Sequence, residues 1–160
     1  MPHVSAERLQ RIFHECERHQ ARMMTAYQHV QHLLPLQPTS YLKLKEEDIA
    51  YIDQFLFRYA KLQDAMGQRL FKAMLVFFQE DVEALPFLDI LNRLEKLEFI
   101  ASAEKWQELR EIRNAIAHEY DDSPELAVQA LNAVFASHQD LRDIYFGLKS
   151  VCGRRIDVYR

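Results

Sequence analysis

Residues 46–79, EEDIAYIDQFLFRYAKLQDAMGQRLFKAMLVFFQ, decide the fold class of this 160-residue chain. Apolar side chains recur along this stretch at intervals of three and four residues, a spacing that places them on one face of an α-helix. They are Ile49, Ile52, Leu56, Tyr59, Leu62, Met66, Ala73 and Phe77. The pattern predicts one long helix from about Glu46 to Gln79, with a continuous apolar stripe facing a core.

Signals that begin or end helices stand on both sides of this stretch. Ser5 is placed to cap a first helix, which Pro35 and Pro38 end. Ser102 and Ser123 are placed to cap two later helices. The predicted helices cover residues 6–34, 46–79, 86–99, 103–120 and 124–151. Because the connections between them are short, the sequence predicts one all-α domain over residues 1–160, an up-down bundle of four to five helices.

The composition agrees with a helical protein and narrows its function. Only 3 Gly and 5 Pro, with 49% hydrophobic residues, are typical of helices rather than of a turn-rich sheet protein. The 20 Lys and Arg against 24 Asp and Glu give a formal net charge of -4. A protein with this charge is not expected to present a broad nucleic-acid-binding surface.

The location of the protein is predicted from what the sequence lacks. Residues 1–13 contain no apolar core of a signal peptide, and no apolar run reaches the roughly 18 residues that span a bilayer. Cys16 and Cys152 show no spacing of a disulfide framework. We therefore expect a soluble cytoplasmic protein that does not bind membranes.

The long helix carries a second set of small or apolar positions beside the first. They are Phe57, Ala60, Asp64, Gly67 and Phe71. A helix that is apolar on two sides either lies in the centre of its own bundle or faces another subunit, and Gly67 would allow close backbone approach. The sequence leaves both alternatives open.

Metal binding is disfavoured by the spacing of the potential ligands. Di-metal helical bundles use Glu-x-x-His pairs, and none of the seven histidines follows a Glu at that spacing. His29 with His32 and Cys16 with His19 are single pairs, whereas a structural zinc site takes four ligands. The stretch HECERH, residues 14–19, is therefore predicted to be a solvated helix face, with no metal bound.

The stretch REIRNAIAHEYDD, residues 110–122, collects polar side chains near the end of a predicted helix. Residues four apart share a helix face, so Asn114 lies beside His118, and Arg113 lies beside Tyr120 seven residues on. His118 would sit among the last carbonyl groups of the helix and near acidic residues, which favour its protonated form. Such a histidine could exchange protons near neutral pH.

Arg113 falls along the edge of an apolar stripe and should be partly buried. The stripe consists of Trp106, Leu109, Ile112 and Ile116. A buried guanidinium needs an acceptor, and the candidates are Asp64 on the long helix or a ligand phosphate. Arginine and histidine together suit phosphodiester cleavage. On spacing alone, a simpler interpretation is favoured, in which Arg113 forms an ordinary salt bridge and His118 only finishes a helix.

The segment RNAIAHEY, residues 113–120, resembles the R-x4-H-x-Y signature of HEPN domains, in particular the HepT-like toxins paired with small nucleotidyltransferase antitoxins. RYAKLQDAMGQRLF, residues 58–71, is similar to a long-helix segment of many such proteins. The resemblance covers roughly Glu46 to Val151. It implies that Arg113 and His118 are catalytic, with Asn114 as a polar companion, and that Tyr120 accepts a nucleotide from the antitoxin.

The resemblance also implies the chemistry and the partners. The family's ribonucleases use no metal or other cofactor, because the RNA 2′-hydroxyl attacks its own phosphate and leaves a cyclic phosphate and a free 5′-hydroxyl. They act as homodimers with motifs from two protomers at one cleft, which would cover the second stripe of the long helix. The expected partners are thus RNA, a second copy of the chain and a nucleotidyltransferase. The alternative is a non-catalytic adaptor or nucleotide-binding subunit for that nucleotidyltransferase.

Overall fold

The computed structural model describes residues 3–116 and 123–158 of the chain, and over these residues the structure is all-helical. The α-helices are α1 (Ala6–Val30), α2 (Pro38–Tyr41), α3 (Glu46–Ala65), α4 (Phe71–Phe77), α5 (Phe87–Lys96), α6 (Ala103–Ala115) and α7 (Pro124–Val158). A 3₁₀ turn, η1 (Gln31–Leu33), follows α1, and a π-helical segment, η2 (Met66–Leu70), joins α3 to α4. The predicted fold class, an all-α bundle, is confirmed.

The predicted serine caps stand at the helix starts. The Ser5 hydroxyl accepts a hydrogen bond from the backbone N–H of Arg8 at 3.1 Å, and the Ser102 hydroxyl accepts one from Lys105 at 3.0 Å. Each bond satisfies one of the N–H groups that have no partner within the first turn of a helix. Local sequence therefore fixes where α1 and α6 begin.

The long predicted helix is present but not uniform. It runs continuously through α3, η2 and α4, with wider π-helical turns at Met66–Leu70 that the periodicity did not predict. It stops at Phe77 rather than Gln79, because Gln79 adopts a left-handed backbone with φ of 65° that an α-helix does not accommodate. Pro38 also differs from the prediction, since it begins the short helix α2 instead of ending α1.

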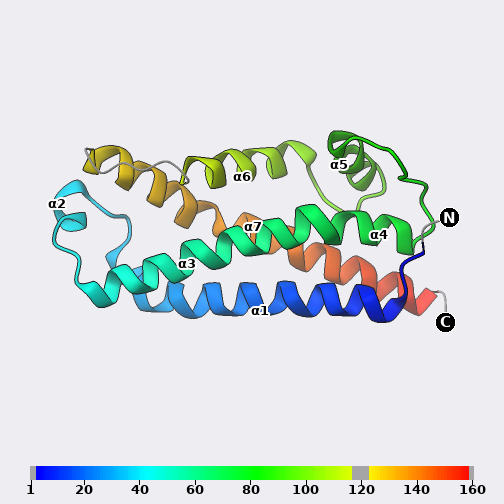
Figure 1. The fold of residues 1–160 in the computed structure, drawn as a ribbon, viewed down its shortest axis with the longest axis horizontal. Coiled ribbons are helices and arrows are strands. Elements are labelled where there is room, and N and C mark those ends of the chain that lie inside the picture. The colour runs from blue at the N-terminus through cyan, green and yellow to red at the C-terminus, as the bar shows by residue number, and fades with distance from the viewer. Residues whose placement is uncertain (1–2, 117–122, 159–160) are drawn as a thin grey trace.

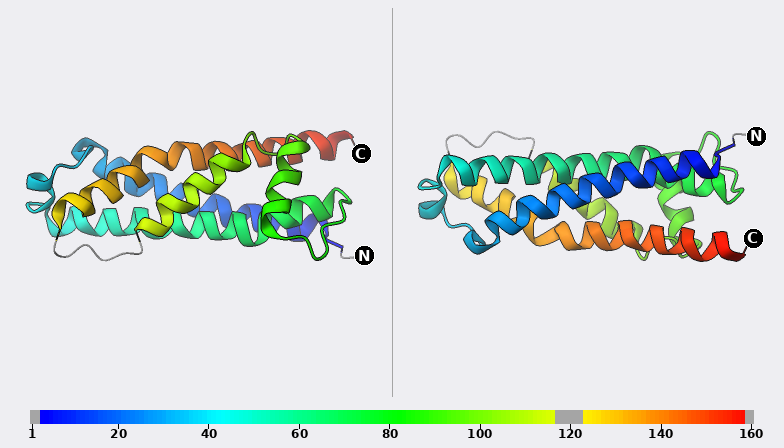
Figure 2. Two further views of the ribbon diagram at one scale, coloured as in Figure 1. Left: turned by 90° about the horizontal axis from the view of Figure 1, so that it is seen from above. Right: turned by 90° about the horizontal axis from the view of Figure 1, so that it is seen from below.

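The helices are arranged so that α3 lies between α1 and α6, with α7 behind them (Figure 1). Helix α6 crosses obliquely from α7 toward α3, as the view from above shows (Figure 2). Near the start of α6, Nζ of Lys105 lies 3.8 Å from Oδ2 of Asp140 in α7. Near its end, Nη2 of Arg113 lies 3.0 Å from Oδ2 of Asp64 in α3. The oblique course brings the last turn of α6 beside the middle of the long helix.

Large aromatic side chains from four elements fill the core. Phe55, Tyr59, Phe71, Trp106 and Tyr145 are fully buried. Phe71 and Trp106 meet edge to face with ring centroids 4.6 Å apart. These rings join α4, α6 and the rest of the bundle in one core.

The second stripe of the long helix is divided between interior and surface. Gly67 faces α6 so closely that a Cβ atom added there would lie 3.1 Å from Cζ2 of Trp106, and Phe71 is buried. Phe57, however, is 49% exposed. The interior alternative therefore holds at Gly67 and Phe71, whereas half of the Phe57 side chain is exposed.

Two further expectations concern the cysteines and membranes. Cys16 and Cys152 are both buried and both free. Burial raises the pKa of the Cys16 thiol to about 12, so it remains protonated and acts as a small apolar side chain. Among the helices of the described residues, none is long and apolar enough to cross a membrane.

Candidate functional site

The candidate site lies at the last turn of α6, where the described part of the motif ends. Arg113 and Asn114 belong to this turn. His118 and Tyr120, with Asp121 and Asp122, lie outside the described residues. The roles assigned to His118 and Tyr120 therefore stay predictions.

Arg113 is held by a carboxylate of the long helix. Its Nη2 donates a hydrogen bond to Oδ2 of Asp64 at 3.0 Å, and both side chains are about one-quarter exposed. Of the two acceptors that the sequence left open, Asp64 is the one that the structure places against Arg113. A charge-assisted bond between half-buried groups fixes the direction of the guanidinium more firmly than a bond at the open surface does.

Asp64 holds a second arginine that the sequence reasoning missed. Nη1 of Arg110 lies 3.4 Å from Oδ1 of Asp64. Arg110 precedes Arg113 by three residues, and this spacing places two helix residues on one face, so the signal was present in the sequence. Two guanidinium groups around one carboxylate leave the cluster with one excess positive charge.

Arg113 keeps part of its hydrogen-bonding capacity. Its Nε is buried and has no hydrogen-bond partner among the described residues. A buried donor without a partner is costly, and sites that bind ligands often contain one. Asn114, the next residue, is exposed. The last turn of α6 thus presents a fixed guanidinium and a solvent-accessible amide next to the segment that carries His118.

The position of this turn depends on packing beneath it. Trp106 and Leu109 are buried, and Ile112 and Ile116 pack partly buried against the core, as the stripe predicted. Nε2 of Gln63, a buried side chain of α3, donates to the backbone oxygen of Leu109 at 2.9 Å. This bond ties α6 to α3 directly beside Asp64.

A buried histidine lies across α3 from this cluster. Nδ1 of His19 accepts a hydrogen bond from Nη1 of Arg58 at 2.8 Å, and His19 is 6% exposed. Burial, and then the charge of Arg58, lower the pKa of His19, although Glu15 lies 3.7 Å from its Nε2. His19 is therefore neutral near pH 7. The prediction that residues 14–19 form a solvated face is wrong at Cys16 and His19, because the 3.6-residue period turns both toward the core.

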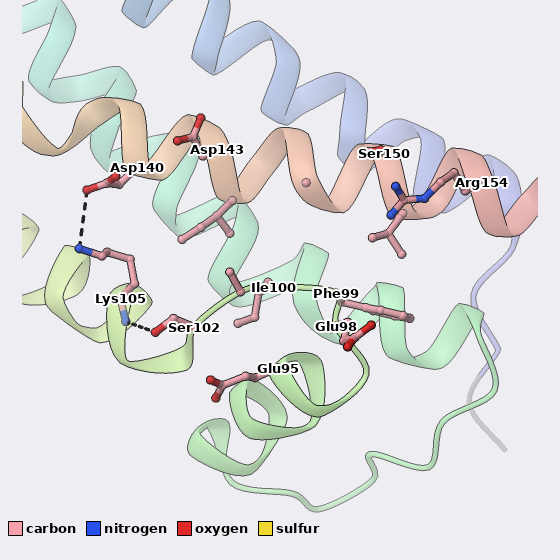
Figure 3. A pocket seen from close by; sticks show the side chains of 14 residues that line it. Glu95, Glu98, Phe99, Ile100, Ser102, Lys105, Asp140, Asp143, Ser150 and Arg154 are labelled. Atoms are coloured by element: carbon pink, nitrogen blue, oxygen red, sulfur yellow. Dashed lines mark hydrogen bonds and ion pairs between the residues drawn. The ribbon is translucent and has the colours of Figure 1, made fainter.

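A recess of about 800 Å³ lies at the start of α6, away from Arg113, between the connection of α5 to α6 and helix α7 (Figure 3). Phe99, Ile100, Ile144 and Val151 supply its apolar lining. Its charged lining is predominantly acidic. The charged residues are Glu95, Glu98, Asp140, Asp143, Lys105 and Arg154. We call it the acidic recess; it contains neither Arg113 nor Asn114, and its charge disfavours a phosphate ligand.

Metal ligands do not gather in the described part of the chain. Over residues 3–116 and 123–158, no group of three or more His, Cys, Asp and Glu side chains is placed to hold a metal ion. Comparisons with models of protein families, with curated proteins and with solved structures found no match to this chain.

Proposed function

We propose that the chain is a metal-independent endoribonuclease of the HEPN type, the toxin of a toxin and nucleotidyltransferase antitoxin pair. The observation that carries the proposal is the placement of Arg113. Asp64 fixes one of its nitrogens, and a second nitrogen has no partner among the described residues. The guanidinium stands in the last turn before the segment that carries His118. Because Nε is buried, it is the exposed quarter of this side chain that would meet a phosphate, while Asp64 fixes the direction of the guanidinium.

The chemistry follows from the two side chains. Arg113 holds the scissile phosphate and stabilises the charge that builds on its oxygens in the transition state. The RNA 2′-oxygen forms a bond to phosphorus, and the bond from phosphorus to the 5′-oxygen breaks. One proton leaves the 2′-hydroxyl and one is added to the 5′-oxygen, so the reaction uses a base and an acid. We assign one of these two proton transfers to His118 and the other to a group supplied by a second copy of the chain.

Regulation by the antitoxin would act through Tyr120. Transfer of a nucleotide to its hydroxyl adds negative charge and bulk two residues from His118. An RNA phosphate would then be repelled from the place that Arg113 prepares for it.

Cleavage of a labelled single-stranded RNA by the purified chain tests the proposal. Arg113→Ala should lower the cleavage rate at least about 100-fold, the usual effect of removing one group that stabilises the transition state. His118→Ala should abolish cleavage. The wild-type products should carry a cyclic phosphate and a 5′-hydroxyl. On expression in cells, wild type should stop growth and neither variant should.

Arg110→Ala is the matched control. It removes the same charge and also a partner of Asp64, but it leaves the bond of Arg113 intact, so the rate should fall less than tenfold. Circular dichroism and thermal unfolding establish that all variants are folded. Folded Arg113→Ala and His118→Ala proteins that cleave as fast as wild type would disprove the assignment.

A second candidate function is an adaptor subunit for the nucleotidyltransferase. The bond between Arg113 and Asp64 favours it in one respect, because an arginine already paired with a carboxylate can serve a structural role. This function predicts tight association with a nucleotidyltransferase and no RNA turnover. The cleavage assay separates the two candidates.

A further inference from the structure

Four basic side chains gather where α1 meets the outer side of α3. They are Arg18 and Arg22 of α1, and Arg58 and Lys61 of α3, and we call them the α1–α3 basic face. Arg58 bonds to His19 of α1, which brings it between the two helices. Arg18, Arg22 and Lys61 are exposed. None of the four lines the acidic recess, whereas Arg18 lines a separate surface hollow on α1.

Carboxylates lie near this face, Asp64 three residues from Lys61 and Glu15 in a surface hollow with Arg18, but they are paired elsewhere. In the part of the chain that the structure describes, none of the four side chains takes part in an ion pair, whereas Glu15 nearby is paired with Arg69 at 2.7 Å. Burial lowers the pKa of Arg58, and repulsion from Arg22 and Arg18 lowers it further. The neighbours that act on the Arg58 charge are therefore cations. An anionic ligand would relieve this repulsion.

An exposed aromatic ring stands among these cations. Phe57 is 49% exposed. The guanidinium carbon of Arg58 lies 5.2 Å from the centre of its ring, and Nζ of Lys61 lies 5.6 Å from the same point. Proteins that bind single-stranded nucleic acid combine cations, which follow the phosphates, with aromatic rings, on which bases stack. Phe57 with its two basic neighbours has both elements.

The basic face is continuous with the candidate site. Lys61 and Asp64 are three residues apart on α3 and thus neighbours on its surface. Asp64 in turn binds Arg113 and Arg110 of α6. Because α3 runs between α1 and α6 (Figure 1), its outer side connects the arginines of α1 to the last turn of α6.

We propose that the α1–α3 basic face, with Phe57, binds the phosphate backbone and bases of single-stranded RNA and guides the strand to Arg113. This inference deepens the proposed ribonuclease function and rests on it. A second copy of the chain docked on this face about a two-fold axis would set cations against cations, which is unfavourable. The charge of the face therefore favours RNA over a symmetric protein contact, and the second copy that the proposed function uses would meet the chain away from Phe57, unlike the homodimer expected from the resemblance.

The experiment measures RNA binding without cleavage. All proteins carry His118→Ala, and fluorescence anisotropy follows their binding to a labelled single-stranded RNA at a series of KCl concentrations. Arg18→Glu with Arg22→Glu should weaken binding at least tenfold at low salt. It should also reduce the slope of log affinity against log salt by about 1.4, since each lost phosphate contact removes about 0.7.

The matched control is Lys96→Glu with Arg154→Glu. These two side chains are exposed, lie on α5 and α7, and make no ion pair within the described residues. The double change alters the net charge by the same four units. Its RNA affinity should stay within threefold of the His118→Ala protein. Equal losses from both double variants would show that net charge alone matters, and would overturn the inference.

A third variant, Phe57→Ala, tests stacking separately from charge. It should weaken RNA binding about tenfold and leave the salt slope unchanged, because the ring makes no phosphate contact. Phe57 is half-exposed, so the variant should fold. Wild-type affinity in both Phe57→Ala and Arg18→Glu with Arg22→Glu would overturn the inference.

Failure of this inference differs from failure of the proposed function. If the wild-type chain cleaves RNA while the basic-face variants bind RNA like the His118→Ala protein, only the route along α1 and α3 is wrong. If the wild-type chain neither cleaves nor binds RNA, both proposals are wrong. If sedimentation shows that the basic-face variants lose a self-association and keep their RNA affinity, the face is a protein contact and the inference is overturned.

Discussion

The α1–α3 basic face and the acidic recess are two surfaces of one bundle with opposite character. The basic face presents four cations without an ion pair among the described residues, beside an exposed phenyl ring. The acidic recess is lined by four carboxylates against two cations, one of which, Lys105, is already paired with Glu108 at 3.1 Å. Helix α6 begins at the acidic recess and ends at Asp64, next to the basic face.

The contrast shows that the net charge of the chain does not tell how its charges are distributed over the surface. A formal charge of -4 argues against a broad nucleic-acid-binding surface. It does not argue against a narrow one. The Debye length in physiological salt is about 8 Å, so carboxylates across the molecule contribute little to the potential at the basic face. The potential at the basic face is therefore set mainly by the charges close to it.

The largest effect should come from disturbing the contact that holds α6 beside α3. Gly67→Val would place side-chain atoms against Trp106, which is fully buried and has little room to move. Overpacking of this kind costs about 1 to 3 kcal/mol. Urea unfolding should show this loss of stability. RNA cleavage should fall as well, because a displaced α6 separates Arg113 from Asp64.

Gly147→Ala is the comparison on the other surface. Gly147 lines the acidic recess, and a Cβ atom added there meets nothing within 4 Å. Alanine in the middle of α7 should stabilise the protein by about 0.5 to 1 kcal/mol, because it has a higher helix propensity than glycine. If Gly67→Val proved as stable as wild type, α6 would not be fixed by close packing against η2.

A smaller effect should follow from Asp64→Asn, which keeps the shape and removes the charge. The ion pair with Arg113 would be replaced by a hydrogen bond from the guanidinium to an uncharged amide oxygen, a loss of about 1 kcal/mol that corresponds to about fivefold to tenfold in cleavage rate. In the His118→Ala background the same change should raise RNA affinity, because a carboxylate beside the basic face is lost. Measuring the cleavage rate and the binding affinity on the same RNA tests whether the rate falls while the affinity rises.

An Asp64→Asn protein that cleaves at the wild-type rate would show that Asp64 does not position Arg113. If Asp64→Asn lowered both the RNA affinity and the cleavage rate, Asp64 would instead be needed to keep the whole RNA-binding surface in place. Thermal unfolding of the variant serves as the control, since both side chains are partly exposed and the fold should tolerate the change.

The sequence predicted the framework of the site because its signals are local. Serine caps marked the starts of α1 and α6, and the apolar period of residues 46–79 identified the long helix. The burial of Arg113 followed from its place at the edge of a stripe. The choice of Asp64 as its partner was open, because the register between two helices depends on side-chain packing that periodicity does not contain.

The parts that could not be predicted depend on contacts between distant segments. The bond of His19 to Arg58 joins residues 39 apart in the chain. The same 3.6-residue period that identified α1 could have shown that His19 faces the core, but not which helix it meets. The π-helical turns of η2 change the phase of the helix after Met66 and break the assumed regular period.

The smallest effect should come from neutralising the acidic recess. Glu95→Gln with Glu98→Gln removes two carboxylates and raises the net charge by two, while it keeps the size of both side chains. Neither residue makes an ion pair within residues 3–116 and 123–158, so the fold should not change. If local charge decides RNA binding, adding the two changes to the His118→Ala protein should alter its RNA affinity by less than twofold.

This small effect is informative because the net-charge explanation predicts a larger one. Were RNA attracted by the sum of all charges, two fewer negative charges would tighten binding at low salt, as removal of Asp64 should. Screening prevents this, since the recess lies between α5, α7 and the start of α6, and the basic face lies on α1 and α3. A rise in affinity as large as that of Asp64→Asn would therefore contradict the separation of the two surfaces. An unchanged affinity would indicate that RNA binding depends on the cations placed on α1 and α3 and not on the net charge of the chain.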